Sequence, residues 1–213
     1  MTEEGKMSFR SFTTQGQAAI ALLVVVVLVI GAMGLVVTLT YNGLVMAEKT
    51  VEESKAQIAT VCQRRLDLIP NLIETVKGYA QHERATLTAV IEARAAAQKA
   101  LSAAKEGGFT KEGIAQLQQT QARLTGAFRG IFALMENYPN LRASSNFLAL
   151  QDQFEGTENR IAVARQRYNS AVKTYNAKIE MFPGVFIAPM FGYTEKDSWE
   201  AEEKAYQAPK AKF

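Results

Sequence analysis

Hydrophobic residues are concentrated in one long run near the start of the chain. The run covers residues 18–40, AAIALLVVVVLVIGAMGLVVTLT, and contains no charged residue and no proline. About 20 apolar residues allow a helix to cross the hydrocarbon core of a bilayer, and Val, Leu and Ile each favour the bilayer centre. A soluble core helix of this composition would need apolar partners on every side, and no other segment offers them. The run therefore predicts a transmembrane helix.

The length of the run argues against a cleaved signal peptide. Signal-peptide apolar cores span about 7–15 residues and end at a small-x-small site, whereas YNGLVMAEK after this run offers no such site. We expect an uncleaved anchor. Two basic residues lie near each end of the run, Lys6 and Arg10 before it and Lys49 and Lys55 after it. The positive-inside rule compares these counts, so it does not assign the cytoplasmic side. The closeness of Arg10 to the run favours a cytoplasmic N-terminus and a domain on the non-cytoplasmic side.

Beyond the run, apolar residues recur at spacings of three and four, which is typical of helices. The first such segment extends over residues 41–80 and contains Pro70. Proline removes a backbone donor from a helix interior, so we expect a kink near residues 66–69, with a helix break as the alternative. The second segment, residues 82–105, is rich in alanine, which favours helix, and Gly107 and Gly108 indicate its end.

Two further helices are predicted in the second half of the chain. Thr110 is a suitable N-cap for the third helix, which Pro139 closes. The fourth begins near Ser144 or Ser145 and ends before Pro183. An aromatic stripe at helical spacing is more typical of a packed core than of a cofactor site, and it comprises Phe128, Phe147, Phe154, Tyr168, Tyr175 and Phe182.

The chain ends in an aromatic and broken segment. Residues 184–213 contain proline and glycine at intervals that exclude one long helix. We expect the first half to pack on the bundle, the membrane surface or a neighbouring subunit, and residues 198–206 to form a short helix. The candidate interaction residues are those too apolar for free solvent, namely Phe186, Met190, Phe191, Tyr193 and Trp199.

No segment shows the alternating pattern of a strand. The expected fold is all-α: a single N-terminal transmembrane helix followed by an up-and-down bundle of about four long helices with coiled-coil-like spacing, and a partly ordered C-terminal tail. The expected boundaries are a flexible tail at 1–17, the transmembrane helix at 18–40, the bundle at 41–183 and the aromatic tail at 184–213.

Composition narrows the function classes. The 24 Lys and Arg residues are interspersed among 21 Asp and Glu, so no basic patch points to a nucleic-acid partner. Cys62 and His82 are the only residues of their types, which disfavours a zinc site. The sequence contains no glycine-rich phosphate loop, no G-x-S-x-G and no H-E-x-x-H. We therefore expect no catalytic residues, no cofactor and no bound metal.

Three stretches together resemble the LemA family. They are CQRRLDLIPNLIETVKGYAQHE at 62–83, NFLALQDQFEGTENRIAVARQRYNSAVKTYN at 146–176 and FPGVFIAPMFGYTEKDSWEAEEKAYQAPKAKF at 182–213, with YNGLV at 41–45 before them. Trp199 departs from the phenylalanine typical of the family. The residues that the resemblance marks as family-motif or structural positions are Arg64, Arg65, Asp67, Pro70, Asn71, Glu158, Asn159, Arg165, Tyr168 and Asn169.

The resemblance implies a single-pass protein of the bacterial inner membrane that carries a helical bundle, in a family with no enzymatic activity assigned to it as a group. A relative among magnetosome membrane proteins is linked to forming the organelle membrane. The first hypothesis is therefore a non-enzymatic scaffold that self-associates as a homo-oligomer and organises or shapes the bilayer. The second is an accessory subunit of another membrane protein, such as a protease or sensor. An enzyme would need Arg65, Glu155, Glu158, Tyr168 and Asn169 to converge on a pocket.

Arg64 and Arg65 lie on either side of the apolar seam of their helix, so one of them is expected to point inward. Such an arginine could bind a lipid headgroup or an acidic partner. The structural alternative, which we favour, is a partly buried arginine paired with Asp67, Glu155 or Glu158, because an unpaired buried charge is costly.

Overall fold

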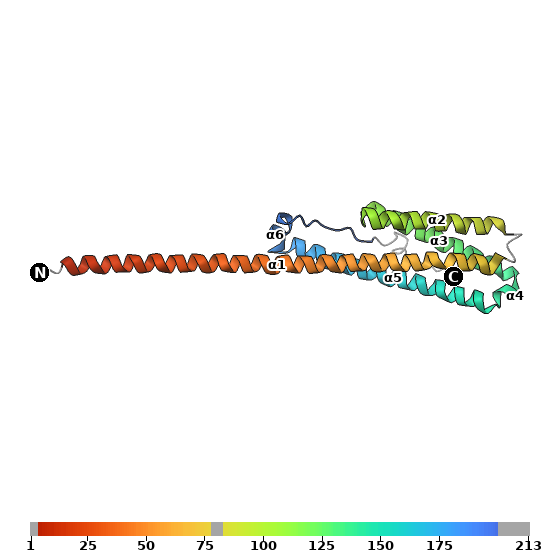
Figure 1. Ribbon diagram of the computed structural model, residues 1–213, viewed down its shortest axis with the longest axis horizontal. Coiled ribbons are helices and arrows are strands. Elements are labelled where there is room, and N and C mark those ends of the chain that lie inside the picture. Colours follow the sequence, from red (N-terminus) through yellow and green to blue (C-terminus); the bar gives the residue numbers. More distant parts are fainter. Residues whose placement is uncertain (1–3, 78–82, 200–213) are drawn as a thin grey trace, which may run out of the picture. The chain divides into compact units, whose positions relative to one another are not determined.

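The computed structural model describes residues 4–77 and 83–199, with side chains from residue 17 onward. All regular structure in these ranges is helical, which confirms the predicted fold class at that level. The elements in chain order are α1 (Glu4–Val76), α2 (Arg84–Gly107), α3 (Lys111–Leu134), η2 (Met135–Asn137), α4 (Pro139–Arg142), α5 (Ser145–Glu180) and α6 (Gly184–Met190). Figure 1 labels these six α-helices.

The chain divides into two compact units, which we describe separately. Of the described residues, 4–46 and 178–194 form the apolar unit, and 47–77, 83–177 and 195–199 form the core unit. The apolar unit holds the N-terminal part of α1 together with α6. The core unit holds the rest of α1, the helices α2 and α3, and most of α5.

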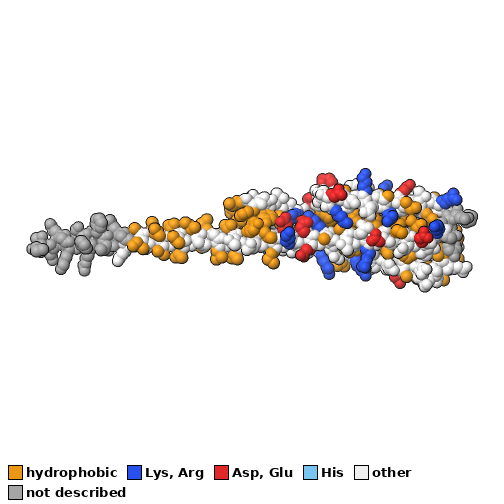
Figure 2. Space-filling model, viewed as in Figure 1, with side chains coloured by type: hydrophobic (Ala, Val, Ile, Leu, Met, Phe, Trp, Pro, Cys, Tyr) orange, Lys and Arg blue, Asp and Glu red, His pale blue; other side chains and the backbone are white. Residues whose placement is uncertain are grey.

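Helix α1 includes the predicted transmembrane run. Its large apolar side chains between Ile20 and Leu39 are exposed in the monomer, apart from the half-buried Val37, and the most apolar 18-residue window has a mean hydropathy of 3.2 with none of it buried. Figure 2 shows these apolar side chains covering the helix. α1 begins at Glu4, inside the segment that we expected to be a flexible tail. Because nucleation is the costly step of helix formation, residues that precede a stable helix extend it easily.

α1 continues through Pro70, so the alternative of a helix break is wrong. Proline has no amide hydrogen, which leaves the carbonyl four residues earlier, that of Leu66, without its usual helical partner. The structure fills this gap from the neighbouring helix, because Arg94 Nε of α2 donates a hydrogen bond to the Leu66 carbonyl oxygen at 3.3 Å. The backbone defect in α1 is thus satisfied by a side chain of α2.

The predicted end of α2 and the predicted start of α3 are confirmed by their geometry. The prediction that Pro139 closes the third helix is wrong, because α3 ends at Leu134 and Pro139 begins α4, where the first position of a helix needs no backbone donor. α2 ends at Gly107, and Gly108 has a φ of 80°, a conformation that glycine adopts without the steric penalty of a Cβ atom. Thr110 caps α3, since the Gly113 amide donates to its Oγ1 at 3.2 Å. Figure 1 shows the two helices lying side by side after this short connection.

The interior of the core unit is aromatic where α3 meets α5. Phe128 and Phe154 stack with ring centroids 4.0 Å apart, and Tyr168 and Tyr175 are almost fully buried. The predicted aromatic stripe is therefore core up to Tyr175. It is wrong for Phe182, which is 81% exposed. α5 ends at Glu180, and the residue before a proline disfavours the helical conformation, so Phe182 does not continue the buried face.

The described part of the chain after α5 contains the short helix α6 and then extended backbone. A Cβ atom on Gly184 would overlap the carbonyl oxygen of Lys178, so glycine permits the close approach at the start of α6. The predicted helix at 198–206 does not begin at Ser198, because Ser198 and Trp199 are not helical, and its remaining residues lie outside the described ranges.

Candidate functional site

A repeated Tyr-Asn pair on α5 holds the chain segment that follows α6. We call residues 195–199 the strap. Asn169 donates from Nδ2 to the Trp199 carbonyl at 2.9 Å and accepts from the Trp199 amide at 2.7 Å. One heptad later, Asn176 makes the same pair of bonds with Lys196, at 2.9 and 3.0 Å. The two asparagine side chains therefore act as backbone mimics that fix the strap along α5.

Side chains around the strap complete its attachment within the core unit. The Tyr168 hydroxyl donates to the Asp197 carbonyl at 2.7 Å, and the Asp197 carboxylate accepts from the Lys111 amide at the start of α3 at 3.0 Å. The Arg165 guanidinium lies 4.6 Å from the centroid of the Trp199 ring, a cation–π distance. Trp199 is 3% exposed, so this predicted interaction residue is used to pack the strap.

A buried arginine joins three helices of the core unit. Arg65 of α1 is 3% exposed and donates from NH1 to Gln121 Oε1 at 3.3 Å and to Thr125 Oγ1 at 3.1 Å, both on α3. Its NH2 lies 3.7 Å from Glu158 on α5, which is one of the three expected pairings. Arg65 Nε and Gln121 Nε2 have no hydrogen-bond partner among the described residues, so the cluster depends strongly on the carboxylate.

Burial sets the protonation behaviour of this region. It lowers the pKa of Arg65, and the nearby Glu158 carboxylate opposes that shift. Burial raises the pKa of the Cys62 thiol from 9.0 to about 11, so the group remains a neutral thiol at physiological pH, unlike a reactive thiolate. Burial also raises the pKa of the Tyr168 hydroxyl, which keeps it protonated as a donor to the strap.

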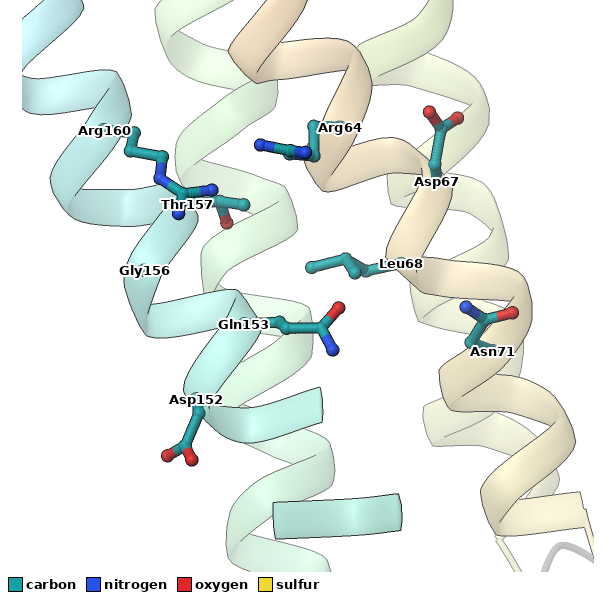
Figure 3. A pocket seen from close by; sticks show the side chains of 9 residues that line it. All are labelled: Arg64, Asp67, Leu68, Asn71, Asp152, Gln153, Gly156, Thr157 and Arg160. Atoms are coloured by element: carbon teal, nitrogen blue, oxygen red, sulfur yellow. The ribbon is translucent and has the colours of Figure 1, made fainter. Parts of the chain in front are cut away.

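An open groove lies between α1 and α5 in the core unit. It consists of two adjoining hollows of about 560 and 450 Å³ that share Arg64 and Arg160. In the close view of the first hollow, Arg64 and Leu68 extend from α1 and Gln153 extends from α5 into the space between the helices (Figure 3). Both walls carry residues from the stretches that resemble the LemA family. We call this feature the α1/α5 groove.

The groove combines charged and apolar side chains. Arg64, Arg160 and Arg167 line it together with Asp67 and Asp152, and apolar contact surface is supplied by other residues, Val61, Leu68, Val163 and Ala164. Mixed surfaces of this kind are typical of protein interfaces, where arginine is enriched. The described residues contain no group of three or more His, Cys, Asp or Glu side chains that could hold a metal ion.

The structure brings together some of the predicted site residues and separates others. Arg65, Glu158 and Arg165 line one hollow with Gln121. Asn71 and Asn159 lie at the α1/α5 groove. The residues named for an enzyme do not converge on one cavity, since Tyr168 and Asn169 bond the strap, whereas the exposed Glu155 accepts from Gln151. His82 lies outside the described residues. Of the predicted interaction residues, Phe186, Met190 and Phe191 are exposed and Tyr193 is half-buried.

Several important residues were not singled out from the sequence. Asn176 has a detectable signal, because the Tyr-Asn pair recurs after seven residues and so returns to the same helix face. Gln121 sits at a core position of the α3 periodicity, and a polar residue there predicts a buried partner. Lys196 and Asp197 carry no such signal, because their hydrogen bonds with α5 are made by backbone groups, which any residue would supply.

Comparison with known proteins gives one family and several relatives. The sequence model described as LemA family matches residues 54–213. Two relatives from Paramagnetospirillum magneticum, named magnetosome proteins MamQ 1 and MamQ 2, are each 24% identical over 204 residues, covering 89% of this chain and 75% of the relative. The magnetosome protein MamQ of Magnetospirillum gryphiswaldense is 23% identical over 172 residues, covering 72% of this chain and 62% of that protein.

Proposed function

This chain belongs to the LemA family, and we propose that it is a non-enzymatic, membrane-anchored scaffold that self-associates and organises or shapes a bacterial membrane. The observation that carries the proposal is the exposed apolar stretch of α1, which no part of the described chain covers. Together with the family membership it marks a membrane-associated helical protein. The magnetosome relatives support a role at the membrane of an organelle or cell.

The proposal includes a membrane topology. Residues 18–40 span the inner membrane once, residues 41–183 carry the up-and-down bundle of about four helices on the non-cytoplasmic side, and the aromatic tail follows. Protease added to sealed inner-membrane vesicles tests the side, because a domain that faces the periplasm is protected in inside-out vesicles. Digestion of the core unit in those vesicles would reverse the assignment.

The non-enzymatic part rests on how the candidate polar groups are used. Arg65 is held by Glu158 and by the α3 side chains, while Tyr168 and Asn169 bond the backbone of the strap. Each of these groups has a structural partner inside the packed core unit. A group that is engaged in this way contributes to stability and would have to leave its partner to act on a substrate.

Self-association is supported by the α1/α5 groove. An exposed apolar residue, Val163, lies in it with 47% of its surface accessible, flanked by arginines that can pair with the aspartates of a second copy. Leu148 on the same helix is equally exposed at 48% and is absent from the lining of the groove. The two residues form a matched pair for testing the interface.

Sedimentation velocity of the full chain in mild detergent tests self-association. We expect concentration-dependent oligomers, and a dissociation constant raised about tenfold or more by Val163→Glu, since a charge at the centre of an interface costs over 1.4 kcal/mol. Leu148→Glu is the control and should leave the constant unchanged. A monomer at every concentration would remove self-association from the proposal.

The second candidate function is an accessory subunit of another membrane protein. The same groove favours it, because a mixed charged and apolar surface also fits a helix of a different protein. A photo-crosslinking amino acid at position 163 in native membranes separates the two. Cross-links to a second copy support the scaffold, whereas one heterologous partner at a fixed ratio supports the accessory subunit.

A further inference from the structure

The segment around α6 is apolar on both of its faces. Residues 181–194 contain no charged side chain. One side of α6 is buried through Gly184, Ile187 and Ala188. The other presents Phe186 and Met190 with 69% and 76% of their surfaces accessible. Met181, Phe182, Val185 and Phe191 add to this exposed surface.

This apolar surface lies at the end of the predicted transmembrane run. Within the apolar unit, the Phe191 ring contacts the Tyr41 ring with centroids 4.8 Å apart, and the Tyr193 ring lies 6.2 Å from the Tyr41 ring. Lys178 Nζ donates to the Gly43 carbonyl at 3.0 Å. Tyr41 follows the last residue of the run directly, and the helical rise of about 1.5 Å per residue keeps Tyr41 and Gly43 within roughly 5 Å of its end.

Figures 1 and 2 show the same relation. α6 lies beside α1, and orange apolar side chains cover both. Tyrosine is enriched where a span leaves the hydrocarbon, and lysine places its ammonium among the headgroups there. Tyr41, Tyr193 and Lys178, which contact one another's segments here, are therefore residue types expected at the membrane–water interface.

We propose that residues 181–191 form a membrane-interface surface that inserts Phe182, Phe186 and Met190 among the lipids of the leaflet in which the transmembrane helix ends. The occupant of this surface is the bilayer itself, because the surface is continuous with the span. The inference rests on the anchoring part of the proposed function. It also deepens that function, since apolar side chains inserted beside the span widen the protein in one leaflet, which favours membrane curvature.

Depth-dependent fluorescence quenching tests this. The full chain with Cys62→Ala carries one new cysteine, Phe186→Cys or Met190→Cys, labelled with an environment-sensitive nitrobenzoxadiazole group. It is reconstituted into phosphatidylcholine–phosphatidylglycerol vesicles at no more than one chain per vesicle. The lipids carry a nitroxide either near the headgroup or near the chain end. Ile30→Cys, near the middle of the run, serves as the depth reference.

At positions 186 and 190 we expect quenching by the headgroup-proximal nitroxide to exceed that by the deep nitroxide about twofold, as for groups 5–10 Å below the surface. At position 30 the order should reverse. Lipid nitroxides could quench the label at position 30 but not those at 186 and 190, while iodide from solution quenches the latter two. That result would overturn the interface surface and leave the anchor intact. No quenching at position 30 would overturn the anchor. Protection of the α6 labels only at several chains per vesicle would assign the surface to a second copy.

Discussion

The hydrogen bond from Arg94 to the Leu66 carbonyl, which Pro70 leaves without its helical donor, predicts an energetic coupling between α1 and α2. If Arg94 satisfies the Leu66 carbonyl only because Pro70 cannot, then replacing Pro70 by alanine should make Arg94 dispensable. The test is a double-mutant cycle with Arg94→Met, Pro70→Ala and the double variant. Methionine keeps most of the apolar stem of the arginine, so the first change removes chiefly the guanidinium group.

The structure sets the expected magnitudes. A hydrogen bond from a charged donor contributes about 1.5–3 kcal/mol. The Arg94–Leu66 bond is 3.3 Å long and only partly buried, so we expect Arg94→Met to cost about 1–2 kcal/mol. Pro70→Ala restores the helical donor and should stabilise the chain by about 1–3 kcal/mol, given a proline penalty near 3 kcal/mol. In the Pro70→Ala background the cost of Arg94→Met should fall close to zero.

Thermal unfolding of the full chain in detergent, followed by the fluorescence of Trp199, measures the cycle. A coupling of about 1–2 kcal/mol exceeds the additivity error of about 0.5 kcal/mol and corresponds to roughly 2–8 °C at this chain length. Arg84→Met, at an exposed position on the same helix, is the control and should change little. An equal cost of Arg94→Met in both backgrounds would refute the reasoning.

Three further changes probe the strap and the core. Asn169→Ala removes two hydrogen bonds to Trp199. The free energy that holds the strap closed should fall by about 2–3 kcal/mol, so the strap should open about 30–100-fold more often. The measurement is a red shift of the emission of the single tryptophan and its stronger quenching by acrylamide. Glu158→Gln leaves Arg65 without its carboxylate and should cost about 2–3 kcal/mol in urea unfolding, somewhat below the range for a fully buried pair. The pKa of Cys62 is higher in the folded chain than in the unfolded chain, because burial favours the neutral thiol. The contribution of Cys62 to the free energy of unfolding is therefore complete below pH 9 and is lost between pH 9 and 11, where the unfolded chain releases the proton first.

Each of these outcomes has a matched control. Asn159→Ala changes an exposed asparagine on the same helix and should leave the tryptophan emission unaltered. An unaltered emission for Asn169→Ala would contradict its role in holding the strap. Glu155→Gln, also on α5, should cost under about 0.5 kcal/mol, and an equal cost for Glu158→Gln would show that the carboxylate does not support Arg65. The Cys62→Ala chain should lack the extra loss of stability above pH 9, and identical pH profiles would count against burial of the thiol.

Local chemistry made much of the fold predictable from the sequence. Thr110 and Gly108 mark helix ends through capping and backbone freedom, and the apolar spacing along α3 and α5 identifies their buried faces. The apolar seam predicts that either Arg64 or Arg65 points inward, and the structure shows that it is Arg65. These features depend on residues a few positions apart, which the sequence displays directly.

Other features depend on contacts between distant segments and were not predictable. That Arg94 would serve the carbonyl opposite Pro70 requires the register of α2 against α1. Trp199 appeared to belong to an exposed interaction surface, and only the pairing of Asn169 with the strap backbone shows that it is buried. The spacing of apolar residues in the sequence extends the buried face of α5 to Phe182, but the helix ends two residues earlier.

The bonds between Asn176 and Lys196 have a topological consequence. They close the base of the intervening stretch, because Lys196 returns to α5 close to Glu180, the residue at which that helix ends. The entropy of closing such a stretch varies only with the logarithm of its length. A change in the length of this stretch therefore costs little closure entropy, and its main effect falls on the contacts that the stretch makes with Tyr41 and Gly43.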